Sequence, residues 1–176
     1  MDSAENSVKA EATLTQLLLT QEGDTLTFQV VDDGKGMTPE ILQGVVDPFY
    51  TTRTTRKVGM GLPLLRMAAE QTGGTMTVES RHRDAYPDSH GTTVTAVFHT
   101  DHIDCPPVGD MVATVTTLIQ GHPDTDFYFR HATGATVVEL DTRELRAVLG
   151  DVSLAEYEVL QWITGVLQDQ YTPQET

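Results

Sequence analysis

The segment VVDDGKGMTPE, residues 30–40, places two acids and two glycines at the end of a strand-like run. The preceding residues alternate so that one face of the predicted strand carries Leu26, Phe28, Val30 and Asp32. Asp32 therefore ends a row of core-facing side chains, whereas Asp33 points the other way. A carboxylate at the inner end of an apolar row is costly unless something donates hydrogen bonds to it. The segment thus predicts that an outside donor meets Asp32.

The paired glycines, Gly34 and Gly36, exceed what a plain turn needs, because one glycine is enough for that. Without β-carbons they would let the backbone approach a flat base closely. The amino group of adenine would be a suitable donor for Asp32. The alternative is a surface turn with Asp33 as the turn residue, and this segment alone does not decide between the two.

A second glycine pair, Gly59 and Gly61 in VGMGLPLL, comes immediately before a predicted helix. Backbone N–H groups at a helix N-terminus, free of side-chain bulk, form an anion site. The formal net charge of the chain is −15, yet the stretch between Pro48 and Ala69 has no acid and contains Arg53, Arg56, Lys57 and Arg66. This basic patch suits a triphosphate. The alternative is a mobile glycine-rich loop whose basic side chains are solvated.

The first helix, predicted over residues 1–10, carries Asp2, Glu5 and Asn6. Asp2 and Asn6 are four residues apart and therefore share one helical face. An asparagine oxygen can bind Mg²⁺ beside phosphate oxygens. A carboxylate one turn away could orient or deprotonate a water or an acceptor hydroxyl. By themselves these residues favour a plain polar helix face.

Hydrophobic patterning predicts strands and helices along the rest of the chain. Strands are expected at residues 13–20, 25–32, 75–80, 92–99, 126–131 and 135–140, and helices at 38–46, 62–73, 108–120, 142–149 and 154–169. The strand at 92–99 opens with Thr92 and Thr93 in HGTTVTAVF, which alone indicates only a turn at a strand start.

Charge changes near residue 101. Residues 1–100 carry 13 acids and 8 bases, whereas residues 101–176 carry 13 acids and 3 bases, none of them lysine. We predict two parts. Residues 1–100 form the domain that carries the adenine and triphosphate sites, and residues 101–176 form an acidic α/β extension made of a helix, a β-hairpin and two helices. The acidic extension disfavours nucleic-acid binding. The single cysteine and the lack of a membrane-length apolar run or signal peptide favour a cytoplasmic protein.

In this order and spacing, the motifs resemble the GHKL superfamily of ATP-binding domains, which includes sensor histidine kinases, gyrase-type topoisomerases and mismatch-repair ATPases. ENSVKAEAT resembles the N box, DDGKGM, GMGLPLL and HGTTVT the three glycine boxes, and DPFYTTR the F box. The resemblance covers about residues 1–99 and is strongest for the histidine-kinase branch. It implies an α+β Bergerat fold, a two-layer α/β sandwich in which a mixed sheet carries helices on one face and ATP lies under a lid.

The resemblance also implies roles for individual residues. Asp32 would bind the adenine amino group, Asn6 would hold Mg²⁺, and Asp2 and Glu5 are the candidate catalytic carboxylates. Further residues on the base side are Gly34, Gly36, Met37 and one of Thr92 and Thr93. Those on the phosphate side are Gly59, Gly61, Leu62 and one of Arg53 and Lys57.

Three features depart from the family pattern. The family's first helix usually begins well before the N box, whereas Asp2 is almost the first residue here, so the chain looks clipped at its start. ATPase branches place glutamate where Asp2 stands. No dimerising hairpin with a phosphoacceptor histidine precedes the ATP-binding motifs.

We therefore expect an Mg-ATP-binding protein of the histidine-kinase type that transfers or hydrolyses the γ-phosphate in a protein-regulatory role. Two alternatives remain open: an ATP-dependent switch without turnover, and an interaction protein with a vestigial pocket. We expect an unidentified protein partner at the acidic extension and allow for a homodimer, with no nucleic-acid or membrane partner.

Overall fold

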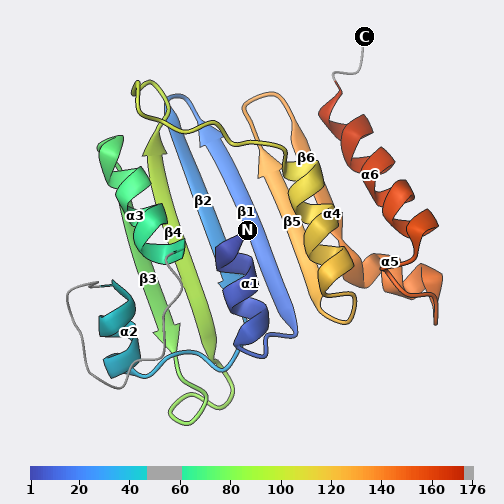
Figure 1. Cartoon of the computed structure of the whole chain (residues 1–176), viewed down its shortest axis with the longest axis horizontal. Coiled ribbons are helices and arrows are strands. Elements are labelled where there is room, and N and C mark those ends of the chain that lie inside the picture. Colours follow the sequence, from blue (N-terminus) through green and yellow to red (C-terminus); the bar gives the residue numbers. More distant parts are fainter. Residues whose placement is uncertain (47–60, 173–176) are drawn as a thin grey trace.

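The computed structural model describes residues 1–46 and 61–172, which form one six-stranded sheet and six helices (Figure 1). The strands are β1 (Leu14–Glu22), β2 (Thr25–Asp32), β3 (Thr75–Arg81), β4 (Gly91–His99), β5 (Asp126–Ala132) and β6 (Val137–Asp141). The helices are α1 (Asp2–Lys9), α2 (Pro39–Val46), α3 (Gly61–Gln71), α4 (Met111–Gly121), α5 (Thr142–Leu149) and α6 (Tyr157–Tyr171). The predicted elements are confirmed, with ends that shift by up to three residues.

The sheet is mixed, as expected. Its strands lie in the order β3-β4-β2-β1-β5-β6. β1 and β5 run parallel, and the other neighbouring strands run antiparallel. This α+β arrangement is consistent with the predicted Bergerat fold.

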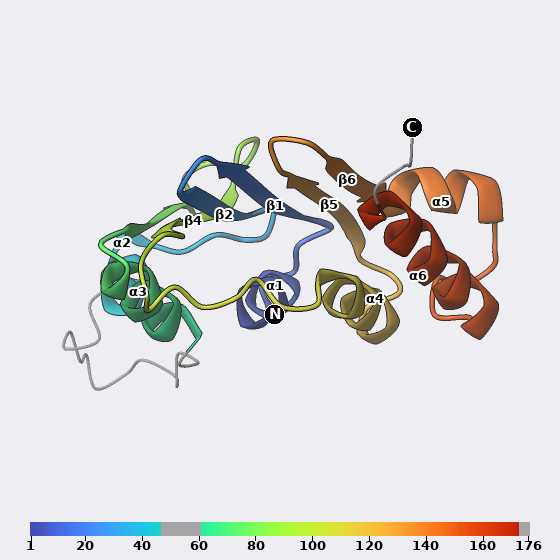
Figure 2. The ribbon, with the colours of Figure 1, turned by 90° about the horizontal axis from the view of Figure 1, so that it is seen from above.

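One face of the sheet is covered by helices. In β1, Leu17 and Leu19 are buried while Gln16 and Leu18, on either side of Leu17, are only half-buried, because successive side chains point to opposite faces. Figure 2 shows α1, α3 and α4 on the same side of the sheet. The strand alternation in the sequence therefore selects which face receives the helices.

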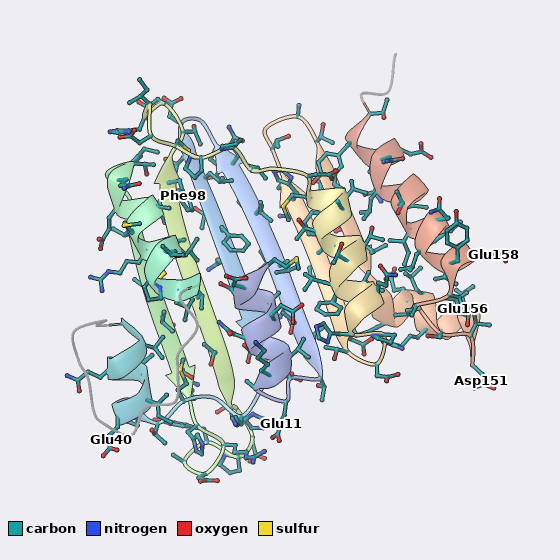
Figure 3. All side chains as sticks on the ribbon, viewed as in Figure 1. Glu11, Glu40, Phe98, Asp151, Glu156 and Glu158 are labelled. Atoms are coloured by element: carbon teal, nitrogen blue, oxygen red, sulfur yellow. The ribbon has the colours of Figure 1, made fainter. Side chains whose placement is uncertain are left out.

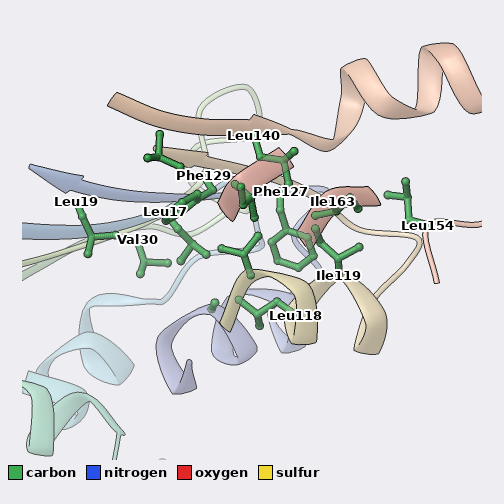
Figure 4. Close-up of a cluster of buried hydrophobic side chains, with 14 of the residues drawn as sticks. Leu17, Leu19, Val30, Leu118, Ile119, Phe127, Phe129, Leu140, Leu154 and Ile163 are labelled. Atoms are coloured by element: carbon green, nitrogen blue, oxygen red, sulfur yellow. The ribbon is translucent and has the colours of Figure 1, made fainter. Parts of the chain in front are cut away.

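The extension continues the same sheet beyond the predicted boundary at residue 100. β5 lies along β1 in a register that pairs Leu14 with Asp126. The buried core is shared as well, since Leu17 and Val30 belong to one cluster with Phe127 and Ile163 (Figure 4). Residues on both sides of the boundary thus bury one another.

Two helices of the extension begin three residues later than expected. The side chain of Asp110 accepts a hydrogen bond from the Ala113 N–H at 3.0 Å and so caps α4. Before α6, the Ser153 hydroxyl accepts from the Ala155 N–H at 3.1 Å, which holds a turn where helix was expected. Asn, Asp and Ser side chains commonly set helix starts in this way. No helix among the described residues is long and apolar enough to cross a membrane.

Candidate functional site

A hollow of about 230 Å³ lies between α1, the segment after β2, the end of α2, the start of α3 and β4. Five segments of the chain therefore meet at one place. Its lining residues are Ser3, Asn6, Ser7, Ala10, Asp32, Lys35, Gly36, Met37, Val45, Leu62, Thr92 and Val94.

Asp32 enters this hollow from the last position of β2. Its Oδ1 atom accepts a hydrogen bond from the Gly34 N–H at 2.9 Å. Thr92 is its neighbour across the β2–β4 ladder. A carboxylate has two acceptor oxygens, and the Gly34 bond uses one of them. The arrangement suits a carboxylate that orients one oxygen through the backbone and offers the other to a ligand.

Asp33 has a different, structural role. Its carboxylate accepts hydrogen bonds from the N–H groups of Thr13 and Leu14, at 2.8 and 3.0 Å, and from the Thr13 hydroxyl. It therefore joins the end of β2 to the start of β1. Partial burial alone would raise the pKa of Asp33, but these hydrogen bonds outweigh it and hold the pKa below its usual value.

Replacing Asp33 with asparagine should lower the free energy of unfolding by about 1 kcal/mol at neutral pH, a modest value because the group is largely solvent-exposed. The folded-state pKa lies below the unfolded value of 3.8, so the carboxylate stabilises the fold above about pH 4 and loses this effect as the pH falls through the folded pKa. Urea unfolding should show the same difference in free energy of unfolding between wild type and variant at pH 7 and pH 5, and a smaller difference at pH 3. A difference that is the same at all three pH values would contradict the assignment.

The two glycines after Asp33 are required by the protein itself. A β-carbon on Gly36 would lie 1.9 Å from the Arg81 carbonyl oxygen, and the φ angle of Gly36 is +69°. A β-carbon on Gly34 would lie 2.8 Å from the Ala10 carbonyl oxygen. The expectation that these glycines exist to admit a base is thus incomplete. Gly36 does line the hollow, whereas Gly34 lies beside it and orients Asp32.

Ser80 organises the Asp32 end of the hollow, and no motif in the sequence points to it. Its hydroxyl oxygen accepts from the Met37 N–H at 2.8 Å, lies 2.8 Å from the Thr92 hydroxyl and 3.3 Å from the Gly91 carbonyl oxygen. One side chain of β3 therefore connects the segment after β2 with the start of β4. A serine in an exposed-looking strand, TMTVESR, gives no local signal of such a role.

The threonine pair is separated by strand alternation. Thr92 lines the hollow and pairs with Asp32, whereas Thr93 is not among the lining residues. Neighbouring residues in a strand point to opposite faces, so only Thr92 can reach the ligand side. Met37 and Leu62 also line the hollow, and their roles toward a nucleotide stay a prediction.

The other end of the hollow is formed by the N-terminal ends of α1 and α3. A β-carbon on Gly61 would lie 2.7 Å from the Asp2 β-carbon and 3.1 Å from its Oδ2 atom. Asp2 thus contacts the first residue of α3, next to Leu62 and one turn before Asn6. The free N–H groups of a helix N-terminus attract anions, so this is the phosphate end if a nucleotide binds. The predicted phosphate-side residues Arg53, Lys57 and Gly59 lie outside the described residues.

Glu5 is not brought to the hollow. Its Oε2 atom lies 2.9 Å from Nε2 of His122, just after α4, and both side chains are partly buried. Neighbouring residues in a helix differ by about 100° in direction, so Glu5 faces the extension while Asn6 faces the hollow. The pair joins the first helix to the extension.

A separate hollow of about 210 Å³ lies between α1, α4 and the sheet. Its lining is largely apolar and includes Leu17, Phe28, Phe98 and Met111. Such a lining offers few of the polar groups that would recognise a nucleotide. Within residues 1–46 and 61–172, no group of three or more His, Cys, Asp or Glu side chains is placed to hold a metal ion.

Comparison with known proteins gives a family match over more than half of the chain. The model of the histidine kinase-, DNA gyrase B-, and HSP90-like ATPase family matches residues 2–102. The sensor histidine kinase ZraS of Klebsiella oxytoca is 43% identical over 51 residues, which cover 29% of this chain and 11% of that protein. The heme sensor protein HssS of Staphylococcus saprophyticus is 30% identical over 96 residues, which cover 53% of this chain and 20% of that protein.

The chain spans about a tenth to a fifth of the length of these relatives. Among solved structures, the N-terminal domain of a DNA repair protein aligns with 80% of this chain and 49% of that chain, with a TM-score of 0.52 and 16% identity. This likeness shows a shared fold, and the alignment extends beyond the residues that the family model matches.

Proposed function

Because the chain belongs to the histidine kinase-, DNA gyrase B-, and HSP90-like ATPase family, we propose that it binds Mg-ATP in the hollow beside Asp32 and transfers or hydrolyses the γ-phosphate. The role we propose is regulatory, with a protein as acceptor or partner. Family membership supports ATP binding. Phosphate turnover, Mg²⁺ as the metal and a protein partner are our proposals.

The observation that carries the proposal is that Asn6 and Asp32 line the same hollow from two different elements. Between them lie Met37, Leu62 and Thr92, which supply an apolar surface and one hydroxyl. Ligand sites of this kind combine apolar walls with a few convergent polar groups. A base would lie at the Asp32 end and phosphates at the Asn6 end.

The residues at the phosphate end fit Mg²⁺ held together with phosphates. Mg²⁺ keeps several waters and binds through one or two protein oxygens plus substrate phosphates, so the Asn6 amide oxygen would be its protein ligand. When bound, the ion would neutralise phosphate charge during transfer. The N-terminus of α3 would hold phosphate oxygens through backbone N–H groups. Asp2, in contact with Gly61, would orient or deprotonate the attacking hydroxyl or water.

A second candidate function, an ATP-dependent switch without turnover, is favoured by a different observation. Glu5, adjacent to Asn6, pairs with His122 of the extension at 2.9 Å. A nucleotide that shifts α1 would therefore act on the extension through this pair. In that case ATP would bind without release of phosphate.

Replacing Asn6 with alanine should reduce phosphate release at saturating Mg-ATP by about 100-fold, because the metal loses its protein ligand. ATP binding should weaken by less than about tenfold, because Asp32 and the apolar walls still hold the base. Calorimetric titration and a phosphate-release assay measure the two effects separately. Ser3→Ala is the matched control, since Ser3 lines the same hollow from the same helix, and both quantities should change by less than about threefold.

The assay also separates the two candidate functions. ATP binding by the wild-type chain without phosphate release or transfer, under conditions that saturate the site, would support the switch and contradict turnover. Failure of the wild-type chain to bind ATP would contradict both.

A further inference from the structure

The extension carries an apolar groove between α5 and α6, on the far side of the molecule from the proposed ATP site (Figure 1). The groove encloses about 540 Å³. Its lining residues are Leu145, Val148, Leu149, Val152, Glu158, Val159 and Trp162. All but one of these side chains are apolar, so the groove is built to receive an apolar group.

Some apolar side chains in and beside the groove are strongly exposed for a folded domain, whereas Val159 in the lining is buried. Val148 is 86% exposed, Trp162 is 55% exposed and the neighbouring Tyr157 is 73% exposed. The core does not need them, because Leu160 and Ile163 on the opposite side of α6 are buried. Contiguous exposed apolar side chains with a polar border mark interaction sites. Aromatic residues such as Trp162 are typical anchors in such sites.

The border of the groove is acidic. Asp151 and Glu156 lie in the segment between the two helices, and Glu158 lies in the first turn of α6 (Figure 3). Glu144 lines a second hollow on the other side of Trp162. The net charge here is therefore negative around an apolar centre.

The two arginines of this region form ion pairs with aspartates that are not part of the acidic border. Arg143 binds Asp141 at 2.7 Å, and Arg146 binds Asp126 at 2.7 Å. They are the only bases among the described residues 137–172. A ligand at the groove would thus meet carboxylates whose negative charge is not offset by an unpaired arginine in this region.

We propose that the α5–α6 groove binds a basic amphipathic segment of a partner protein, with apolar side chains against Val148 and Trp162 and Lys or Arg side chains against the acidic border. Helix-in-groove binding of this type uses apolar anchors at helical spacing, and complementary charge speeds encounter and selects the partner. A second copy of this chain is a poor occupant, because its net charge of −15 would bring like charges together.

A binding experiment can use the only tryptophan of the chain, Trp162, as the reporter. The probe is a 14-residue peptide of Leu and Lys in which Leu recurs at helical spacing, and its control is a scrambled peptide of the same composition. Titration of the full chain should give a blue shift of the tryptophan emission with the patterned peptide. The scrambled peptide should bind at least about tenfold more weakly, because it cannot present one apolar face.

Charge reversal tests the acidic border. The pair Glu156→Lys and Glu158→Lys should weaken binding of the patterned peptide about tenfold or more. The matched pair Glu22→Lys and Glu40→Lys changes the net charge equally at exposed sites on other elements, and it should change binding less than about threefold.

Three results would overturn the proposal. The first is equal binding of the patterned and scrambled peptides, and the second is equal loss of binding in the two charge-reversal pairs. The third is a dimer in sedimentation of the chain alone that Val148→Asp dissociates, because the groove would then be an interface between two copies.

Discussion

Asp32→Asn should weaken ATP binding by about 100-fold or more and leave the fold intact. The Gly34 N–H bond to Oδ1 of Asp32 can be retained by the amide oxygen of asparagine. The amide NH₂ group then takes the place of the second carboxylate oxygen, so a donor would face the donor of the bound base. Two hydrogen-bond donors that face each other without an acceptor reduce the binding free energy by about 2–3 kcal/mol. Calorimetric titration with Mg-ATP measures the loss.

Asp33→Asn is the matched control for this prediction. The two aspartates are neighbours in sequence, yet only Asp32 lines the hollow, and Asp33 binds Thr13 and Leu14. At neutral pH the Asp33 variant should bind ATP with an affinity within about threefold of the wild type, apart from its modest loss of stability. Equal loss of binding in both variants would mean that the site is not at Asp32.

Gly36→Ala should lower the free energy of unfolding by about 3 kcal/mol or more. The left-handed φ of +69° costs a side-chain-bearing residue about 1 kcal/mol. The overlap of its β-carbon with the Arg81 carbonyl oxygen, at 1.9 Å, adds about 2 kcal/mol because the backbone of β3 must move. Denaturant unfolding with circular dichroism measures the change. ATP binding should fall as well, since Gly36 lines the hollow.

Gly23→Ala separates the two contributions. Gly23 also has a left-handed φ, +56°, but a β-carbon there would meet nothing within 4 Å. The Gly23 variant should therefore lose only about 1 kcal/mol. If the two alanine variants lost the same stability, the close approach of β3 to Gly36 would be wrong.

Local patterns in the sequence predict the elements of this fold well. The alternation at Leu26, Val30 and Asp32 identifies β2, its buried face and the direction of Asp32, and Asp32 does line the hollow. The four-residue spacing of Asp2 and Asn6 likewise indicates that they share a helical face near the proposed phosphate end. These features depend on one element each, so the periods of strand and helix are sufficient to predict them.

Contacts between distant elements are not predictable in this way. The role of Ser80 depends on how β3 lies against Met37 and Thr92, and nothing in its own strand marks it. Adjacency in the sequence places Glu5 with Asp2 and Asn6, but the helical turn directs it to His122. The reason for Gly36 also depends on a distant carbonyl, that of Arg81. In each case one partner, namely Met37, His122 or Arg81, lies more than 40 residues away in the chain.

The parallel pairing of β1 and β5 has a consequence for synthesis on the ribosome. Leu14 meets its partner Asp126 only after 112 further residues have been translated, which takes about 6–22 seconds at typical elongation rates. During that interval the nascent chain can form the β1–β2 hairpin but has an open edge along β1. Unpaired edges of this kind invite association with other chains. The nascent protein is therefore expected to need protection by ribosome-associated chaperones until β5 emerges.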